Sequence, residues 1–148
     1  MAWYVLLLLN RKPFRHSAKP TRHETVSLFV MSLAANFNGT LTFVVHEVSH
    51  LKSKIDPYVK ISTGSRSVKT SFKKDCSNGA TYEEKLAMSF NGSEDQVKLE
   101  VWDHDRWSSD DLEDGSTVPI QRIMEWADGT PKWINLNGGI KVKITICK

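Results

Sequence analysis

The chain has 148 residues, of which 40% are hydrophobic and 25% charged, the proportions of one ordinary globular domain. No apolar run reaches the roughly 18 residues of a membrane-spanning helix, so an integral membrane protein is excluded. The net charge of +3 comes from residues 1–30, which hold five bases and one acid, whereas the rest of the chain holds 15 bases and 16 acids. A nucleic-acid-binding domain is normally strongly basic, so the nearly neutral remainder excludes that class of protein.

The N-terminal residues predict an extension. An apolar run, Ala2–Leu9, precedes Arg11 and Lys12, the reverse of the order in a secretory signal, and two prolines interrupt any amphipathic transit helix. We therefore predict that residues 1–38 are a disordered extension. Two alternatives are left open: a translation start at Met31, and an extra strand at residues 26–31. Because only two cysteines are present, we expect a reducing, cytoplasmic location.

From Gly39 onward the hydrophobic period is two, which is typical of half-buried strands. The clearest example is Ile140–Ile146, where isoleucine and valine alternate with lysine and threonine. One helical turn is predicted at Gln121–Ala127. Because turn residues separate the strands, residues 39–148 are predicted to form an all-β, eight-stranded antiparallel sandwich. In chain order, the predicted strands contain Leu41–Val45, Tyr58–Ser62, Ser67–Phe72, Leu86–Phe90, Val97–Val101, Ser116–Ile120, Trp133–Leu136 and Ile140–Ile146.

Four aspartates lie within nine residues directly after the strand at Val97–Val101. Crowded carboxylates repel one another unless solvent or a cation relieves the repulsion. Calcium is suited to such a loop, because it takes six to eight hard oxygen ligands. A solvated acidic loop is the alternative that composition leaves open. The four are Asp103, Asp105, Asp110 and Asp111.

The chain from residue 39 to 147 resembles the C2-domain family. The resemblance implies a C2-type β-sandwich, and the strand at the C-terminus favours the family's permuted second topology. It rests on several short segments in the right order: Asp56-Pro57-Tyr58-Val59, Val68-Lys69-Thr70, Thr81-Tyr82-Glu83-Glu84, Val101-Trp102-Asp103-His104-Asp105 and Trp133-Ile134-Asn135-Leu136.

The resemblance implies calcium as a cofactor, held by loops that meet at one end of the sandwich. The segment before Asp56 departs from the family pattern, because it holds Lys52 and Lys54 where an additional aspartate is usual. Fewer ligand charges imply weaker calcium binding. The positions that match the family's ligands are Asp56, Asp103, Asp105 and Asp111.

The resemblance also implies calcium-dependent, reversible docking of a monomer on anionic phospholipid membranes. A calcium-independent module that binds phosphoinositides or a protein partner is the alternative, and we expect no enzymatic activity. The predicted membrane contacts are Trp107, at the apex of its loop, Arg106, Leu51 and Ile55. The predicted basic lipid patch, on or near one strand, consists of Arg66, Lys69, Lys73 and Lys74.

His46-Glu47-Val48-Ser49-His50 matches the zinc-protease motif H-E-x-x-H. That motif needs a helix, on which residues four apart are neighbours. Here it continues the strand pattern of Leu41–Val45, and an extended chain would separate the two histidines by about 13 Å at ~3.3 Å per residue. A zinc protease is therefore a remote alternative.

Overall fold

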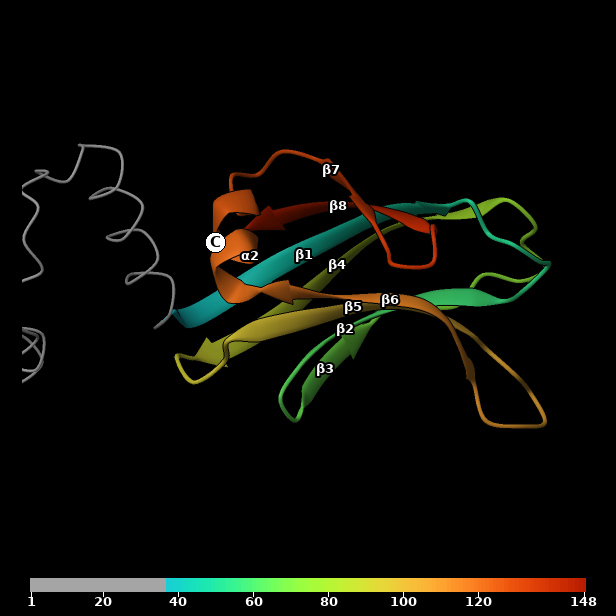
Figure 1. Ribbon diagram of the computed structural model, residues 1–148, viewed down its shortest axis with the longest axis horizontal. Helices are drawn as coiled ribbons and strands as arrows, with labels where there is room; N and C mark the ends of the chain where they lie inside the picture. The colour runs from blue at the N-terminus through green and yellow to red at the C-terminus, as the bar shows by residue number, and fades with distance from the viewer. Residues whose placement is uncertain (1–36) are drawn as a thin grey trace, which may run out of the picture.

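The computed structural model of the protein describes residues 37–148, which form two four-stranded antiparallel sheets packed face to face (Figure 1). The prediction of an all-β, eight-stranded sandwich is confirmed. Within these residues no helix is long and apolar enough to cross a membrane. The prediction of a disordered extension, and the extra strand left open at residues 26–31, lie outside the described residues.

Sheet 1 has the strand order β4-β1-β8-β7, and sheet 2 has the order β3-β2-β5-β6. The C-terminal strand therefore lies next to the first described strand in the middle of sheet 1. In chain order, the elements are β1 (Asn38–Ser49), β2 (Pro57–Thr63), β3 (Arg66–Lys69), β4 (Gly79–Asn91), β5 (Gln96–Asp103), β6 (Asp111–Pro119), α2 (Ile120–Trp126), β7 (Lys132–Asn135) and β8 (Lys141–Cys147).

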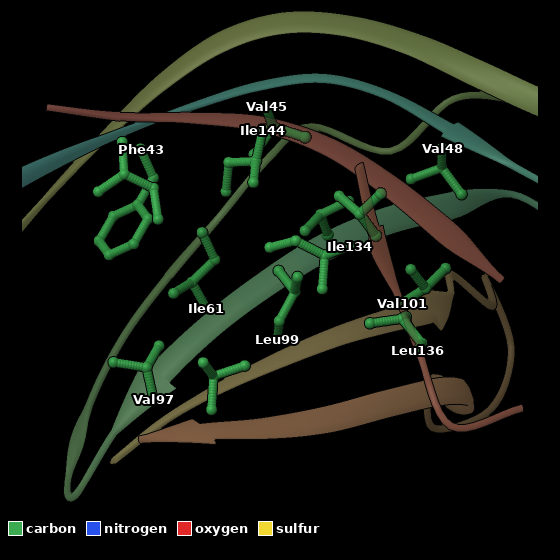
Figure 2. Close-up of a cluster of buried hydrophobic side chains, with 14 of the residues drawn as sticks. Phe43, Val45, Val48, Ile61, Val97, Leu99, Val101, Ile134, Leu136 and Ile144 are labelled. Atoms are coloured by element: carbon green, nitrogen blue, oxygen red, sulfur yellow. The ribbon is translucent and has the colours of Figure 1, made fainter. Parts of the chain in front are cut away.

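The core lies between the two sheets (Figure 2). Along each strand, about every second residue faces inward and contributes its side chain to this core. Phe43 and Val45 of β1 face Ile61 of β2 and Leu99 of β5, and all four are at most 4% exposed. A fully buried side chain of this size contributes roughly 1.5–3 kcal/mol relative to exposure. The alternation in the sequence therefore places one face of each sheet in the core and leaves the other free for binding.

A β-bulge interrupts β1 at His46, between Val45 and Glu47. The extra residue shifts the inward face from odd to even positions, so that Val48 is buried at 2% exposure. The strand then continues to Ser49. There β1 lies so close to β4 that a side chain would not fit at Gly79, the residue of β4 opposite Ser49. A Cβ atom at Gly79 would lie 2.4 Å from the carbonyl oxygen of Val48.

Two strands begin earlier than predicted. β4 starts at Gly79 rather than near Leu86, and β6 starts at Asp111 rather than Ser116. Both added segments are largely polar and contain a glycine, so their intrinsic propensity to form a β-strand is weak. Pairing with β1 and β5 holds them in the sheets. The helix predicted at Gln121–Ala127 is present as α2, one residue earlier at each end.

The buried carboxylate of Asp114 joins β6 to the turn between β7 and β8. It accepts hydrogen bonds from the backbone N–H groups of Gly115 (2.8 Å), Gly138 (2.7 Å) and Ile140 (2.9 Å). A second bulge in β6, opposite Val101 and Trp102, turns this side chain inward. Because a buried charge needs such partners, Asp114 fixes the turn against sheet 2.

Candidate functional site

Three of the predicted calcium ligands meet at one end of sheet 2. The strand register places Asp103, at the end of β5, opposite Pro57 on one side and Asp111 on the other. The backbone N–H of Asp56 donates to Oδ1 of Asp103 at 2.7 Å, and the N–H of His104 donates to the carbonyl of Asp56 at 3.0 Å. The loops before β2 and after β5 are therefore joined directly.

The loop between β5 and β6, residues 104–110, is here called the aspartate loop, and Asp110 fixes its shape. The Tyr58 hydroxyl donates to Oδ2 of Asp110 at 2.8 Å. Oδ1 lies 3.1 Å from Nδ1 of His104 and accepts the backbone N–H of Asp105 at 3.2 Å. The His104 ring packs against Phe72, with ring centroids 4.2 Å apart. Asp110 thus ties the loop to β2.

We expect Tyr58→Phe to raise the pKa of Asp110. The Tyr58 hydroxyl is the largest cause that holds this pKa below its usual value, followed by the N–H of Asp105. With a lowered pKa, ionised Asp110 favours the folded loop above the usual carboxyl pKa, and this contribution is lost as the pH falls through the lowered value. Side-chain carboxyl titration by NMR would measure the change. An unchanged pKa of Asp110 in the variant would exclude this role for Tyr58.

The predicted membrane contacts divide into two groups. Trp107 is 96% exposed at the tip of the aspartate loop, and Arg106 beside it is also exposed. Leu51 and Ile55 are buried at 8% and 6% exposure within the core. An isolated backbone bridge between Ile55 and Cys76 turns the segment inward. The prediction that Leu51 and Ile55 contact a membrane is therefore wrong, because the core takes these apolar side chains.

The predicted basic patch is also divided. Arg66 lies at the far end of β3, where Nη1 donates to Glu94 Oε1 (2.6 Å) and to the Ser89 carbonyl (2.8 Å). Lys73 and Lys74 follow β3 and lie beside the loop before β2, since the Lys73 N–H donates to the carbonyl of Pro57. Arg66 and Lys69 thus lie at opposite ends of β3, with Lys73 and Lys74 beyond Lys69, and lipid binding by these four residues stays a prediction.

The outer face of sheet 2 holds a basic group of which sequence reasoning predicted Lys69 and missed Lys60 and Lys98. Lys60 and Lys69 are opposite each other in the register of β2 and β3. Lys69 Nζ lies 4.8 Å from the centre of the Tyr58 ring, and Lys60 Nζ lies 5.3 Å from that of Trp102. We call Lys60, Lys69 and the exposed Lys98 of β5 the lysine face. The period-two alternation of Tyr58-Val59-Lys60 is the sequence pattern from which the position of Lys60 on this face could have been predicted.

The H-E-x-x-H motif lies on β1 and the residue after it, not on a helix. His46 Nδ1 is 2.8 Å from Glu83 Oε2, and its Nε2 is 2.8 Å from Thr145 Oγ1. His50 has a left-handed backbone (φ 64°) and contacts Ser49. The motif therefore lacks the helical geometry on which zinc proteases depend.

Comparison with known proteins assigns the fold. The family model for the C2 domain matches residues 39–136, and the chain belongs to this family. It is 38% identical over 82 residues to the 16 kDa phloem protein 1 of Arabidopsis thaliana, and the match spans 52% of this chain and 53% of that protein.

Solved structures agree with this assignment. The calcium-bound C2A and C2B domains of Extended-Synaptotagmin 2 match with a TM-score of 0.63 and 16% identity, over 74% of this chain and 45% of that chain. The C2A domain of plant Extended Synaptotagmin 1 matches with a TM-score of 0.58 and 17% identity, over 74% and 94%. The chain thus spans about half the length of the curated relative and less than half of the first of these structures.

The aspartate end has the right chemistry for calcium but an incomplete arrangement. Among residues 37–148, no three His, Cys, Asp or Glu side chains are placed so that they could share a metal ion. One oxygen of Asp56 and one of Asp103 accept backbone N–H groups, and both oxygens of Asp110 are engaged. Calcium needs six to eight oxygens. Its binding at Asp56, Asp103, Asp105 and Asp111 stays a prediction.

Proposed function

We propose that this C2 domain is a binding module that docks reversibly on anionic phospholipid membranes, with the lysine face and the tip of the aspartate loop as the contact surface. The observation that carries the proposal is the side-by-side placement of Lys60 and Lys69, each with its ammonium over an aromatic ring. Cation–π contacts hold a charged head at a defined position without neutralising it. Glu100, opposite Lys60 in the register of β2 and β5, adds one negative charge to this face, and the three lysines leave the four residues net positive.

Trp107 extends the same surface toward the bilayer. Trp102, whose ring lies under the Lys60 ammonium, is one residue from the end of β5, and β5 leads directly into the loop that carries Trp107 (Figure 1). Tryptophan favours the interface between lipid headgroups and acyl chains. A lysine or arginine near an anionic leaflet contributes roughly 1 kcal/mol, so a few such groups with one tryptophan give weak, reversible binding.

Calcium-promoted docking is the second candidate, favoured by the convergence of Asp56, Asp103 and Asp111 at this end of sheet 2. Bound calcium would supply positive charge to an acidic loop end, and anionic headgroups would then be attracted. Here the carboxylates, rather than the lysine face, would decide whether the domain binds.

Vesicle cosedimentation of the full chain separates the two candidates. In chelator, we expect pelleting with phosphatidylcholine vesicles that contain phosphatidylserine or a phosphoinositide, little pelleting with phosphatidylcholine alone, and weaker binding as salt rises. Trp107→Ala should reduce binding severalfold. Pelleting that appears only when calcium is added would favour the second candidate, and no pelleting under any condition would refute both.

A further inference from the structure

The loop before β2 carries a cation within the acidic end of the domain. Lys54 Nζ lies 2.8 Å from Oδ1 of Asp75, which belongs to the connection between β3 and β4. The backbone N–H of Asp75 donates to Oδ1 of Asp56 at 2.7 Å, and Asp56 in turn donates its N–H to Asp103 at 2.7 Å. One continuous series of contacts thus joins three segments that are distant in the sequence.

The backbone of Asp75 is arranged for this contact. Its φ angle is 57°, in the left-handed region that aspartate tolerates better than most residues. In this conformation the residue directs its N–H to Asp56 and its carboxylate to Lys54. The neighbouring bridge between Ile55 and Cys76 holds the two segments in register.

Asp75 brings the ammonium group of Lys54 beside Asp56. Its carboxylate pairs with Lys54 Nζ, and its backbone N–H donates to Asp56. The positive charge of Lys54 therefore lies close to one of the four carboxylates expected to bind calcium.

We infer that Lys54 is a tethered cation with two effects. Through Asp75 it joins the loops of the acidic end without a metal ion, and its positive charge weakens the affinity of that end for calcium. A metal ion among these carboxylates would meet a positive charge close to Asp56, and the cluster would also lack the oxygen ligands that a carboxylate at this position could add. The contacts of Lys54, Asp75 and Asp56 join these loops through protein groups.

The consequence at the membrane rests on the proposed function: an end of the domain that is already ordered docks without waiting for a calcium signal. The inference about Lys54 itself needs no lipid. A calcium titration therefore tests it separately, and a failure of vesicle binding would leave that result intact.

The test is calorimetric titration of the full chain with calcium chloride, with thermal unfolding in calcium and in chelator as a second readout. We expect weak or undetectable calcium binding by the wild type. Lys54→Asp should increase calcium affinity at least about tenfold, because it removes a cation and adds a carboxylate ligand. It should also make the melting temperature depend on calcium.

Lys85→Asp is the matched control, because Lys85 is exposed on β4, outside the loops of the acidic end, and the substitution changes the net charge equally. It should leave calcium affinity almost unchanged. Lys54→Ala removes the ammonium without adding a ligand, and we expect an intermediate gain together with a lower melting temperature in chelator. Tight calcium binding by the wild type, or equal gains from Lys85→Asp and Lys54→Asp, would overturn the inference.

Discussion

Simultaneous replacement of Lys60 and Lys69 by glutamate is expected to abolish pelleting of the domain with anionic vesicles. The double substitution changes the charge of the lysine face by four. At roughly 1 kcal/mol per charge near an anionic leaflet, binding should weaken by about 4 kcal/mol, or roughly a thousandfold. Cosedimentation over a series of lipid concentrations would measure the loss. Alanine at the two positions changes the charge by only two, so it should have a smaller effect of the same sign.

The control for this experiment lies on the opposite sheet. Lys85 of β4 and Lys141 of β8 are on the outer face of sheet 1, and their replacement by glutamate produces the same change in net charge. If the lysine face is the contact surface, this second double variant should retain most of its binding. Equal losses in both double variants would show that only the net charge matters, and the assignment of the face would be withdrawn.

The fold was predictable because period-two alternation places each side chain on one of two faces. The run Ile140–Ile146 alternates without interruption, and it forms the central strand β8. The beginning of β6 was not predictable in this way, because Asp111–Gly115 has weak strand propensity and depends on β5 for its hydrogen bonds. The bulge at His46 also escaped prediction, since a two-residue period gives no sign of an inserted residue.

The candidate site was predictable only in part, for a similar reason. Loops at one end of a sandwich meet, so the approach of Asp56 to Asp103 followed from the expected topology. The pairing of Lys54 with Asp75 joins residues in different loops, and no pattern in the sequence marks it. Leu51 was misread because an apolar residue in a short loop fits both a membrane contact and the core, and only packing decides between them.

Replacement of Asp114 by alanine is expected to lower the free energy of unfolding by roughly 3 kcal/mol, because three backbone N–H groups lose a charged acceptor. For a domain of this size that corresponds to a melting temperature about 10 °C lower. Chemical denaturation and calorimetry would measure the loss. Glu113→Ala is the control: Glu113 is half-buried beside Asp114 and makes no side-chain hydrogen bond within residues 37–148, so its loss should be small.

The same contact can be tested from the opposite side, at Gly138. A Cβ atom there would lie 2.8 Å from the Asp114 carboxylate, so Gly138→Ala alone should also destabilise the fold. In Asp114→Ala the carboxylate is gone and the space is open, so a second substitution at Gly138 should cost little more. Double-mutant analysis should therefore show strong non-additivity. Additive losses would mean that Asp114 and Gly138 stabilise the domain independently, and that the turn between β7 and β8 is held by something other than this carboxylate.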